Sequence, residues 1–461
     1  MIKPIKTLLF IFPVFVFFAS ATTQTPEHRH PVVAEIAEEI SVENIEHIVQ
    51  RLVAFHTRHT LSDTTHPDRG IGAARRWIKR EFEDYSRASG NRLRVAYHRF
   101  IAEPQPRIPE ATEIVNVVAT LPGRLTGEKE RVYVISGHYD SRVSDILDAE
   151  SYAPGANDDA TGTAVVMELA RVMSKYEFDA TIVFMAVAGE EQGLVGARRW
   201  TQDAYQQKMN IQGMITNDII GNIFGGNDVV DNTRVRVFSE GVNPNTTDEE
   251  LRRIVATGGE NDSPSRQLAR YIHEVAPKYV DNFDVVMIYR RDRYLRGGDH
   301  IPFNELGYPA VRFTEMNENY NWQHQDVRFE EGIQYGDLPE FVDYEYTANV
   351  GRINAAALAS LALAPPPPVN AGIDISRLEH DTTLRWEHDG TGEPAGFYIC
   401  IRETTAPQWQ RKVFVDSDQV KTNEGFSYTV EGVSKDNYIF GIQSVGSNGL
   451  HSVTVFPDPV R

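Results

Sequence analysis

The sequence predicts an α/β fold, in which helices sandwich a mainly parallel mixed sheet, followed by a smaller all-β sandwich. Short β-branched apolar runs, typical of buried strands, alternate along the chain with longer segments of helical periodicity. A further observation marks where this pattern ends. Pro365–Pro368 is a run of prolines that stops the preceding helix, and only short strand-like runs follow it.

The elements of the α/β part are predicted from the period of their apolar residues. Buried strands are expected at residues 114–119, 132–136, 180–187, 211–218 and 310–314. Helices are expected at residues 33–60 (one or two helices), 70–85, 162–173, 193–206, 265–276 and 344–363. In such a fold the functional side chains gather at the carboxyl ends of the strands.

The C-terminal part shows strand-like runs separated by turn-rich stretches, a spacing typical of a small β-sandwich. The runs are residues 382–386, 396–402, 412–415, 427–430 and 438–445. Trp386 and the run Tyr438–Ile442 resemble fibronectin type III modules. This part holds no catalytic constellation, so we expect a packing or attachment module that contacts a surface or another protein.

The N-terminus carries a compartment signal. Lys3 and Lys6 precede the apolar run Leu8–Phe18, which is short for a membrane span, and small residues follow at 19–21. We therefore expect a cleaved signal and a secreted or periplasmic protein. The predicted division is a signal peptide at 1–21, an α/β domain at 33–364, a Pro-rich linker at 365–370 and the β-sandwich at 371–461.

The composition argues against two classes of binding partner. The chain has 461 residues, with 65 acidic against 46 basic side chains and a net charge of −19. This balance argues against a nucleic-acid or anionic-membrane partner. Cys400 is the single cysteine, so no intrachain disulfide can form, and a large core and bound metal are expected to supply stability.

Two motifs with metal-binding side chains follow the strand predicted at 132–136. His138 can bind zinc through one ring nitrogen while Asp140 fixes the tautomer through the other, although a structural loop histidine would also explain this pair. Asp158 and Asp159 lie in a glycine-flanked turn before a predicted helix. Capping that helix would require only one of the two acids.

Further candidates come from the next strand ends. Glu190 and Glu191 follow the strand at 180–187 and suit a pair of general base and metal ligand, although an exposed acidic helix start would also place two glutamates together. Asp218 ends the strand at 211–218. His324 lies far downstream in a polar loop.

The order and spacing of these segments resemble the co-catalytic dizinc aminopeptidases, an M28-like peptidase family. Its members share His-x-Asp, Gly-Ala-x-Asp-Asp-x-Ser/Thr-Gly, Gly-Glu-Glu-x-Gly-x-x-Gly, Asp and then His. The resemblance covers residues 40–362. It implies a zinc-exopeptidase-like fold and a secreted metallopeptidase that hydrolyses peptide bonds, as an aminopeptidase releasing N-terminal residues from peptide substrates.

The resemblance also implies a cofactor of two zinc ions and a ligand for each position. His138 and Asp218 correspond to the ligands of one zinc ion. Glu191 and His324 correspond to the ligands of the other, and Asp158 to the bridging carboxylate. The positive charge of two divalent cations would explain why three carboxylates gather at one place.

Two further roles follow from the same resemblance. Glu190 matches the catalytic general base, and Asp140 matches the acid that orients the first histidine. The peptide bond between Asp158 and Asp159 is expected to be cis, as in the family.

One departure concerns the last histidine. In the family it stands four residues before an aspartate, a position that Trp322 holds here relative to Asp326, whereas His324 lies two before it. His300 is the rival ligand, although its segment resembles a substrate-pocket loop of the family.

Three alternatives stay open. Glutaminyl cyclases of similar fold use one zinc ion and resemble this chain at residues 299–303. A carboxypeptidase would need a basic pocket, for which Arg293 and Arg296 are candidates. A catalytically inactive binding module should lack the base or a ligand, whereas Glu190 is present.

Overall fold

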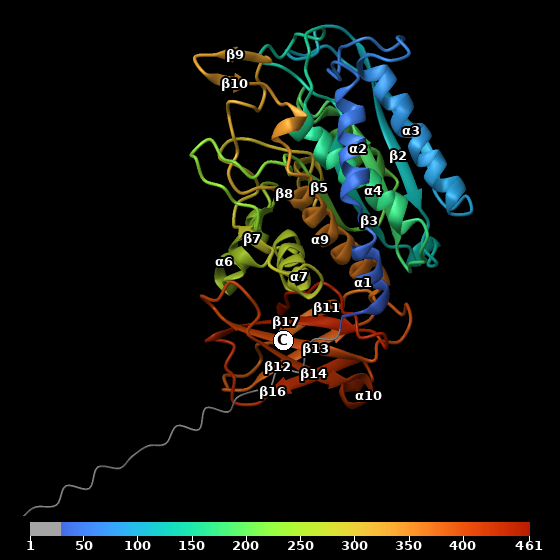
Figure 1. Cartoon of the computed structure of the whole chain (residues 1–461). Helices are drawn as coiled ribbons and strands as arrows, with labels where there is room; N and C mark the ends of the chain where they lie inside the picture. The colour runs from blue at the N-terminus through green and yellow to red at the C-terminus, as the bar shows by residue number, and fades with distance from the viewer. Residues whose placement is uncertain (1–28) are drawn as a thin grey trace, which may run out of the picture.

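The computed structural model describes residues 29–461, so the signal peptide predicted at 1–21 lies outside the described residues and stays a prediction. Within the described range, no helix is long and apolar enough to cross a membrane. Figure 1 shows a larger α/β part with a β-rich part below it.

A mixed sheet forms the centre of the α/β part, with strand order β1-β2-β4-β3-β5-β8-β6-β7. Strands β4, β3, β5 and β8 are parallel, β1 and β2 form an antiparallel margin, and β6 and β7 run antiparallel to β8. The strands are β1 Arg94–Ala102, β2 Thr112–Leu121, β3 Val132–His138, β4 Thr181–Val187, β5 Ile211–Asn217, β6 Arg234–Ser239, β7 Asp284–Ile288 and β8 Ala310–Glu315. The predicted mainly parallel mixed sheet is confirmed.

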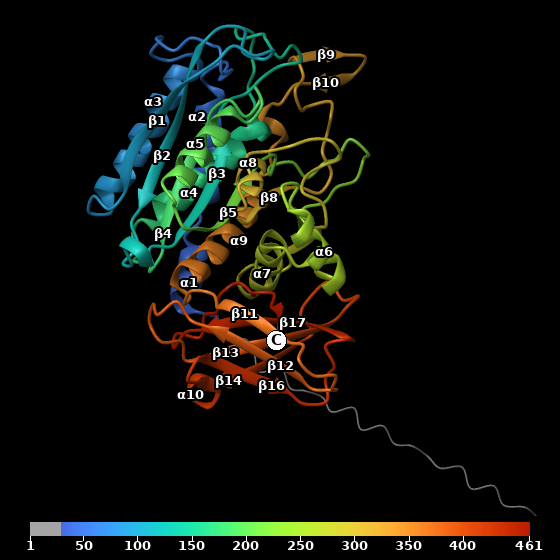
Figure 2. The ribbon, with the colours of Figure 1, turned by 180° about the vertical axis from the view of Figure 1, so that it is seen from behind.

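Helices cover both faces of this sheet (Figures 1 and 2). They are α1 Pro31–Glu38, α2 Val42–Val53, α3 Gly70–Ala88, α4 Thr161–Met173, α5 Val195–Gln206, α6 Asp248–Thr257, α7 Pro264–Tyr279, α8 Ile301–Glu305 and α9 Tyr344–Leu363. A short hairpin of β9 Arg328–Glu330 and β10 Ile333–Tyr335 projects beside the upper end of the sheet in Figure 1.

Strand β4 shows why the sheet needs two layers of helices. Its residues are all buried, with Ile182 and Phe184 in the larger core that α4 and α9 complete. The alternate residues Val183 and Met185 belong to a second core with Trp200 of α5. Because successive side chains of a strand point to opposite faces, an unbroken apolar run is buried only when both faces are covered.

The C-terminal part is a sandwich of two sheets with strand orders β15-β16-β12-β11-β18 and β14-β13-β17. Both sheets contribute to one apolar core around the fully buried Trp386. Its elements are β11 Val369–Asp374, β12 Thr382–Glu387, β13 Gly396–Glu403, β14 Arg411–Asp416, α10 Ser417–Val420, β15 Lys421–Thr422, β16 Gly425–Val430, β17 Tyr438–Val445 and β18 Asp458–Val460. The all-β sandwich is confirmed, while the likeness to fibronectin type III modules stays a prediction.

Buried charges join the sandwich to the α/β part along α7. Asp262, just before α7, pairs with Arg270 at 2.9 Å and with Arg402 of β13 at 2.5 Å. Glu274 of α7 lies beside Lys412 and His451 of the sandwich. The sandwich lies away from the carboxyl ends of the parallel strands (Figure 1). Whether 33–364 and 371–461 fold as separate domains stays a prediction.

Candidate active site

The candidate site lies at the carboxyl ends of three neighbouring parallel strands. His138 is the last residue of β3, and Asp218 directly follows β5. Glu190 and Glu191 lie in the turn between β4 and α5. The parallel pairing of β3 with both β4 and β5 brings these ends to one edge of the sheet.

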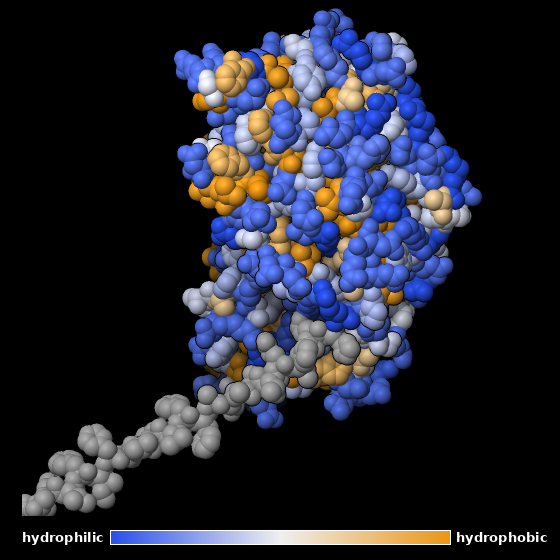
Figure 3. Space-filling model, in the orientation of Figure 1, coloured by the Kyte–Doolittle hydropathy of each residue, from blue (hydrophilic) through white to orange (hydrophobic). Residues whose placement is uncertain are grey.

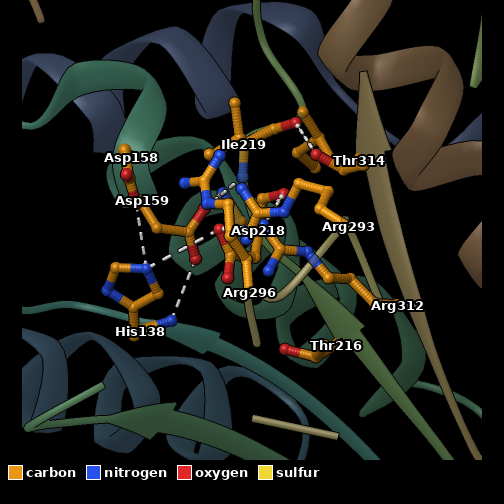
Figure 4. Close-up of polar contacts among 12 residues, drawn as sticks. His138, Asp158, Asp159, Thr216, Asp218, Ile219, Arg293, Arg296, Arg312 and Thr314 are labelled. Carbon is orange, nitrogen blue, oxygen red and sulfur yellow. Dashed lines mark hydrogen bonds and ion pairs between the residues drawn. The ribbon is translucent and has the colours of Figure 1, made fainter. Parts of the chain in front are cut away.

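A first cluster joins His138, Asp158 and Asp218, whose ligand atoms lie within 4.8 Å of one another. His138 Nε2 is 3.1 Å from Asp158 Oδ1 and 3.8 Å from Asp218 Oδ1. All three residues are buried. Figure 4 shows the imidazole facing the two carboxylates.

A second cluster shares Asp158 and adds Glu191 and His324. His324 Nε2 is 2.9 Å from Asp158 Oδ2 and 3.0 Å from Glu191 Oε1. His324 has a φ of 55°, an uncommon conformation for a residue with a Cβ. The loop therefore brings His324 to the site despite its unusual spacing from Asp326, and the five predicted ligands come together as two triads.

The turn that carries Asp158 is held by a residue that the sequence analysis missed. Asp337 accepts hydrogen bonds from the backbone nitrogens of Asn157, at 2.9 Å, and Asp158, at 2.7 Å. Asp159 belongs to neither cluster, and its carboxylate accepts hydrogen bonds from the backbone nitrogens of His138 and Gly162. The peptide bond between Asp158 and Asp159 is cis, as predicted.

Asp140 is buried beside the imidazole but acts mainly on the glutamate turn. Its carboxylate accepts from the backbone nitrogen of Glu191 at 3.1 Å and from that of Glu190 at 3.4 Å. His138 Nδ1 lies 3.2 Å from the Asp140 backbone oxygen and 3.6 Å from its carboxylate. The backbone carbonyl is thus the nearer partner of the ring, and the carboxylate positions the two glutamates.

Arg312, in β8, is a second residue that no motif revealed. Its guanidinium is fully buried, and Nη2 lies 2.8 Å from Asp218 Oδ1 (Figure 4). It also donates to the Gly297 backbone oxygen at 2.7 Å. Burial favours the neutral form of Asp218, but Arg312 and His138 outweigh burial and lower its pKa. Asp218 is therefore held ionised, as a ligand of a cation must be.

Two further acids of the site have raised pKa values. Burial, together with the neighbouring carboxylates of Asp218, Glu191 and Asp299, holds the pKa of half-buried Glu190 well above its usual range. Burial also raises the pKa of Asp299 to about 7, and neither of its carboxylate oxygens makes a hydrogen bond within the described residues. A raised carboxyl pKa suits a group that gains and loses a proton.

His300 takes no part in either cluster. Its Nε2 lies 2.7 Å from the backbone oxygen of Arg291, and burial lowers its pKa to about 4. These contacts make it a structural histidine of the turn before α8.

The donor set fits zinc. His138 Nε2 and Glu191 Oε1 are buried, and neither makes a hydrogen bond within the described part of the chain, although carboxylate or imidazole atoms lie nearby. Leaving such atoms unpaired is unfavourable unless another partner completes them. Imidazole nitrogen and carboxylate oxygen are ligands that zinc accepts.

The clusters open into a cleft of about 810 Å³. It is lined by Glu190 and by four of the five cluster residues, Asp158, Glu191, Asp218 and His324. Leu194, Leu295 and Tyr320 line it as well. Four arginines also line it: Arg107, Arg142, Arg293 and Arg296. The site is therefore accessible to a solute of peptide size from one side.

Comparison with known proteins gives consistent results. The model of the family described as Peptidase family M28 matches residues 116–341. A probable zinc metalloprotease of Leptosphaeria maculans is 46% identical over 424 residues, which cover 92% of this chain and 96% of the relative. One of Pyricularia oryzae is 46% identical over 427 residues, with 91% and 83% covered.

Solved structures show the same fold. The LapA aminopeptidase of Legionella pneumophila has a TM-score of 0.51 at 21% identity and covers 72% of this chain and 76% of its own. An aminopeptidase from Aneurinibacillus sp. strain AM-1 has a TM-score of 0.50 at 16% identity, with 72% and 96% covered. At these identities the likeness concerns the fold.

Proposed function

Because the chain belongs to peptidase family M28, we propose that it is a secreted aminopeptidase that holds two zinc ions and removes N-terminal residues from peptides. The observation that carries the proposal is the pair of ligand triads that share Asp158 beside Glu190. The description of the fungal relatives as probable zinc metalloproteases supports peptide-bond hydrolysis. The apolar run Leu8–Phe18 supports secretion.

The protein's own groups divide the reaction between them. One ion would be held by His138 and Asp218, and the other by Glu191 and His324. Asp158 would contribute to both sites. Zinc, when bound, acidifies water and polarises the scissile carbonyl. Glu190 accepts the proton of the attacking water at its carboxylate and delivers it to the leaving amine. Its raised pKa suits this exchange, because a stronger base takes the proton more readily.

Aminopeptidase action is favoured by the charges of the cleft. Arg293 and Arg296, the basic residues considered for a carboxypeptidase, donate to Glu318 at 3.1 and 2.8 Å. Their positive charge is therefore already compensated. The acids around the clusters would attract a free N-terminal ammonium group.

A carboxypeptidase is the second candidate, on account of two other arginines. Arg107 donates to the backbone oxygen of Glu191, and Arg142 Nε lies 3.4 Å from Glu191 Oε2 without a hydrogen bond. These groups could receive a terminal carboxylate. Two full ligand triads, by contrast, argue against the one-zinc glutaminyl cyclase and the inactive module.

The experiment compares one peptide in three forms, with zinc content measured on the same sample. We expect cleavage of the free and the C-amidated peptide, no cleavage of the N-acetylated peptide, and two zinc ions per chain. Cleavage that needs a free carboxylate but not a free amine would establish the carboxypeptidase instead. One zinc ion with cyclisation of N-terminal glutamine would establish the glutaminyl cyclase.

A further inference from the structure

We propose that Leu194, Leu295 and Tyr320 form an apolar exit rim that binds apolar side chains of the substrate downstream of the scissile bond. The inference rests on the proposed aminopeptidase function and adds a substrate class: peptides of several residues with apolar side chains beyond the second position. All three residues line the same cleft as Glu190 and His324.

The exposure of the rim is unusual for apolar side chains at a polar site. Leu295 is 91% exposed and Tyr320 is 63% exposed, and Tyr294 next to them is 74% exposed. Single exposed apolar residues are common, but several around one cleft mark a contact surface. Figure 3 shows apolar patches at the left edge of the upper half, the side on which the β9–β10 hairpin lies in Figure 1.

The backbone of both leucines of the exit rim has an unfavourable conformation. Leu194 has a φ of 62° and Leu295 a φ of 57°, in the left-handed region that residues with a branched or bulky side chain rarely adopt. Such positions are found where the surrounding structure enforces them, often at binding sites. Both leucines line the cleft that contains Glu190.

The segment that carries Leu295 is anchored on both sides. Arg293 and Arg296 donate to Glu318, two residues before Tyr320. Arg293 and Arg312 both donate to the Gly297 backbone oxygen. Glu318 therefore ties the Leu295 segment to the Tyr320 segment, so the two side chains are presented by one braced unit. A braced apolar surface loses little conformational entropy when a ligand binds.

The position of the rim identifies the part of the substrate that it contacts. In an aminopeptidase the N-terminal residue lies at the metal ligands, and the rest of the peptide must leave through the mouth of the cleft. The proposed metal ligands His138 and Asp218 are buried, whereas the apolar side chains of Leu295 and Tyr320 in the cleft lining are exposed. The rim thus meets residues that follow the scissile bond, not the residue that is released.

The test uses two peptides with the same scissile bond, Leu-Ala-Phe-Phe-amide and Leu-Ala-Ser-Ser-amide. For the wild-type protein we expect kcat/KM about tenfold higher for the Phe-Phe peptide, mainly through KM. Leu295→Asn and Tyr320→Asn should each lower this preference about threefold or more. Asn suits the left-handed conformation at 295, so the backbone is preserved. Leu378→Asn, in the sandwich, is the matched control, because Leu378 is fully exposed and remote from the cleft.

Binding gives a readout that is independent of turnover. In the Glu190→Gln background, calorimetry should show the same ratio of Kd for the two peptides and the same reduction by Leu295→Asn. An equal Kd for both peptides, or a control variant that shifts the ratio as much as the rim variants, would overturn the exit rim. If the wild-type protein cleaves neither peptide but the Kd ratio remains, the aminopeptidase proposal fails, while Leu194, Leu295 and Tyr320 still bind apolar peptide side chains.

Discussion

Substitution of Asp337 tests whether a side chain outside the two triads sets their affinity for zinc. Its carboxylate accepts backbone hydrogen bonds of 2.7 and 2.9 Å from the turn that aims Asp158. In Asp337→Asn one oxygen remains an acceptor, while the amide NH₂ faces the other backbone N–H. A buried backbone N–H that loses its partner in this way costs about 1–3 kcal/mol. If that cost falls on the bound state, zinc affinity decreases about 10–100-fold, the range seen when partners of ligands are removed.

The assay is a zinc titration against a competing chelator, with thermal unfolding of the metal-free protein measured in parallel. Asp63→Asn is the matched control, because Asp63 also accepts two backbone hydrogen bonds, from Thr65 and His66, but is exposed. Zinc affinity of Asp337→Asn within twofold of the wild type would refute the reasoning. An equal decrease of zinc affinity in Asp63→Asn would refute it as well.

Three other predictions follow from the same structure. Glu190→Gln should keep its zinc content but lower kcat at least about a hundredfold, and near-normal turnover would exclude Glu190 as the base. Arg402→Ala should destabilise the protein by about 3–5 kcal/mol in denaturant unfolding, because it leaves buried Asp262 with one partner fewer; a change under 1 kcal/mol would show that the junction tolerates the loss. Burial raises the pKa of Glu274, but Lys412 and His451 outweigh it and hold the pKa well below its usual 4.5. This contribution to stability is complete above about pH 4.5 and is lost as the pH falls through the lower folded pKa, so Glu274→Gln should flatten the acid branch of the stability curve.

The sequence predicted well those elements that have an unambiguous apolar pattern. The strand expected at 180–187 is observed at Thr181–Val187, and the helix expected at 344–363 has those bounds. It missed β1, whose side chains alternate between exposed and half-buried and include charged residues, and the short strands β6 and β7. β1 and β7 are the edge strands of the sheet, and a strand that is not buried on both faces has a weak apolar signal. β6 is internal, but Arg234 and Arg236 interrupt its short apolar run.

The site was predictable to the extent that its residues form local motifs. Four of the five proposed ligands, together with Glu190, came from short local motifs, and the structure brings them together. His324 came only from the order of the motifs in the resembling family. Asp337 and Arg312 could not be found in this way, because each reaches the site from a distant segment as a single charged residue. The one signal for Arg312 was its place inside an apolar strand, where an unpaired charge would be costly.

The fully buried Arg58 shows that the functional unit begins well before the segment that identifies the family. Its guanidinium donates to the backbone oxygens of Leu52, Tyr139, Pro154 and Gly155. One side chain thus ties the end of α2 to the two turns that present the first histidine and the shared aspartate. The family model starts at residue 116. A protein trimmed to that boundary would lose Arg58 and Leu52 together, and the backbone oxygens of Tyr139, Pro154 and Gly155 would lose their common donor. The ligands would all be present, but the turns that position two of them would lack this support.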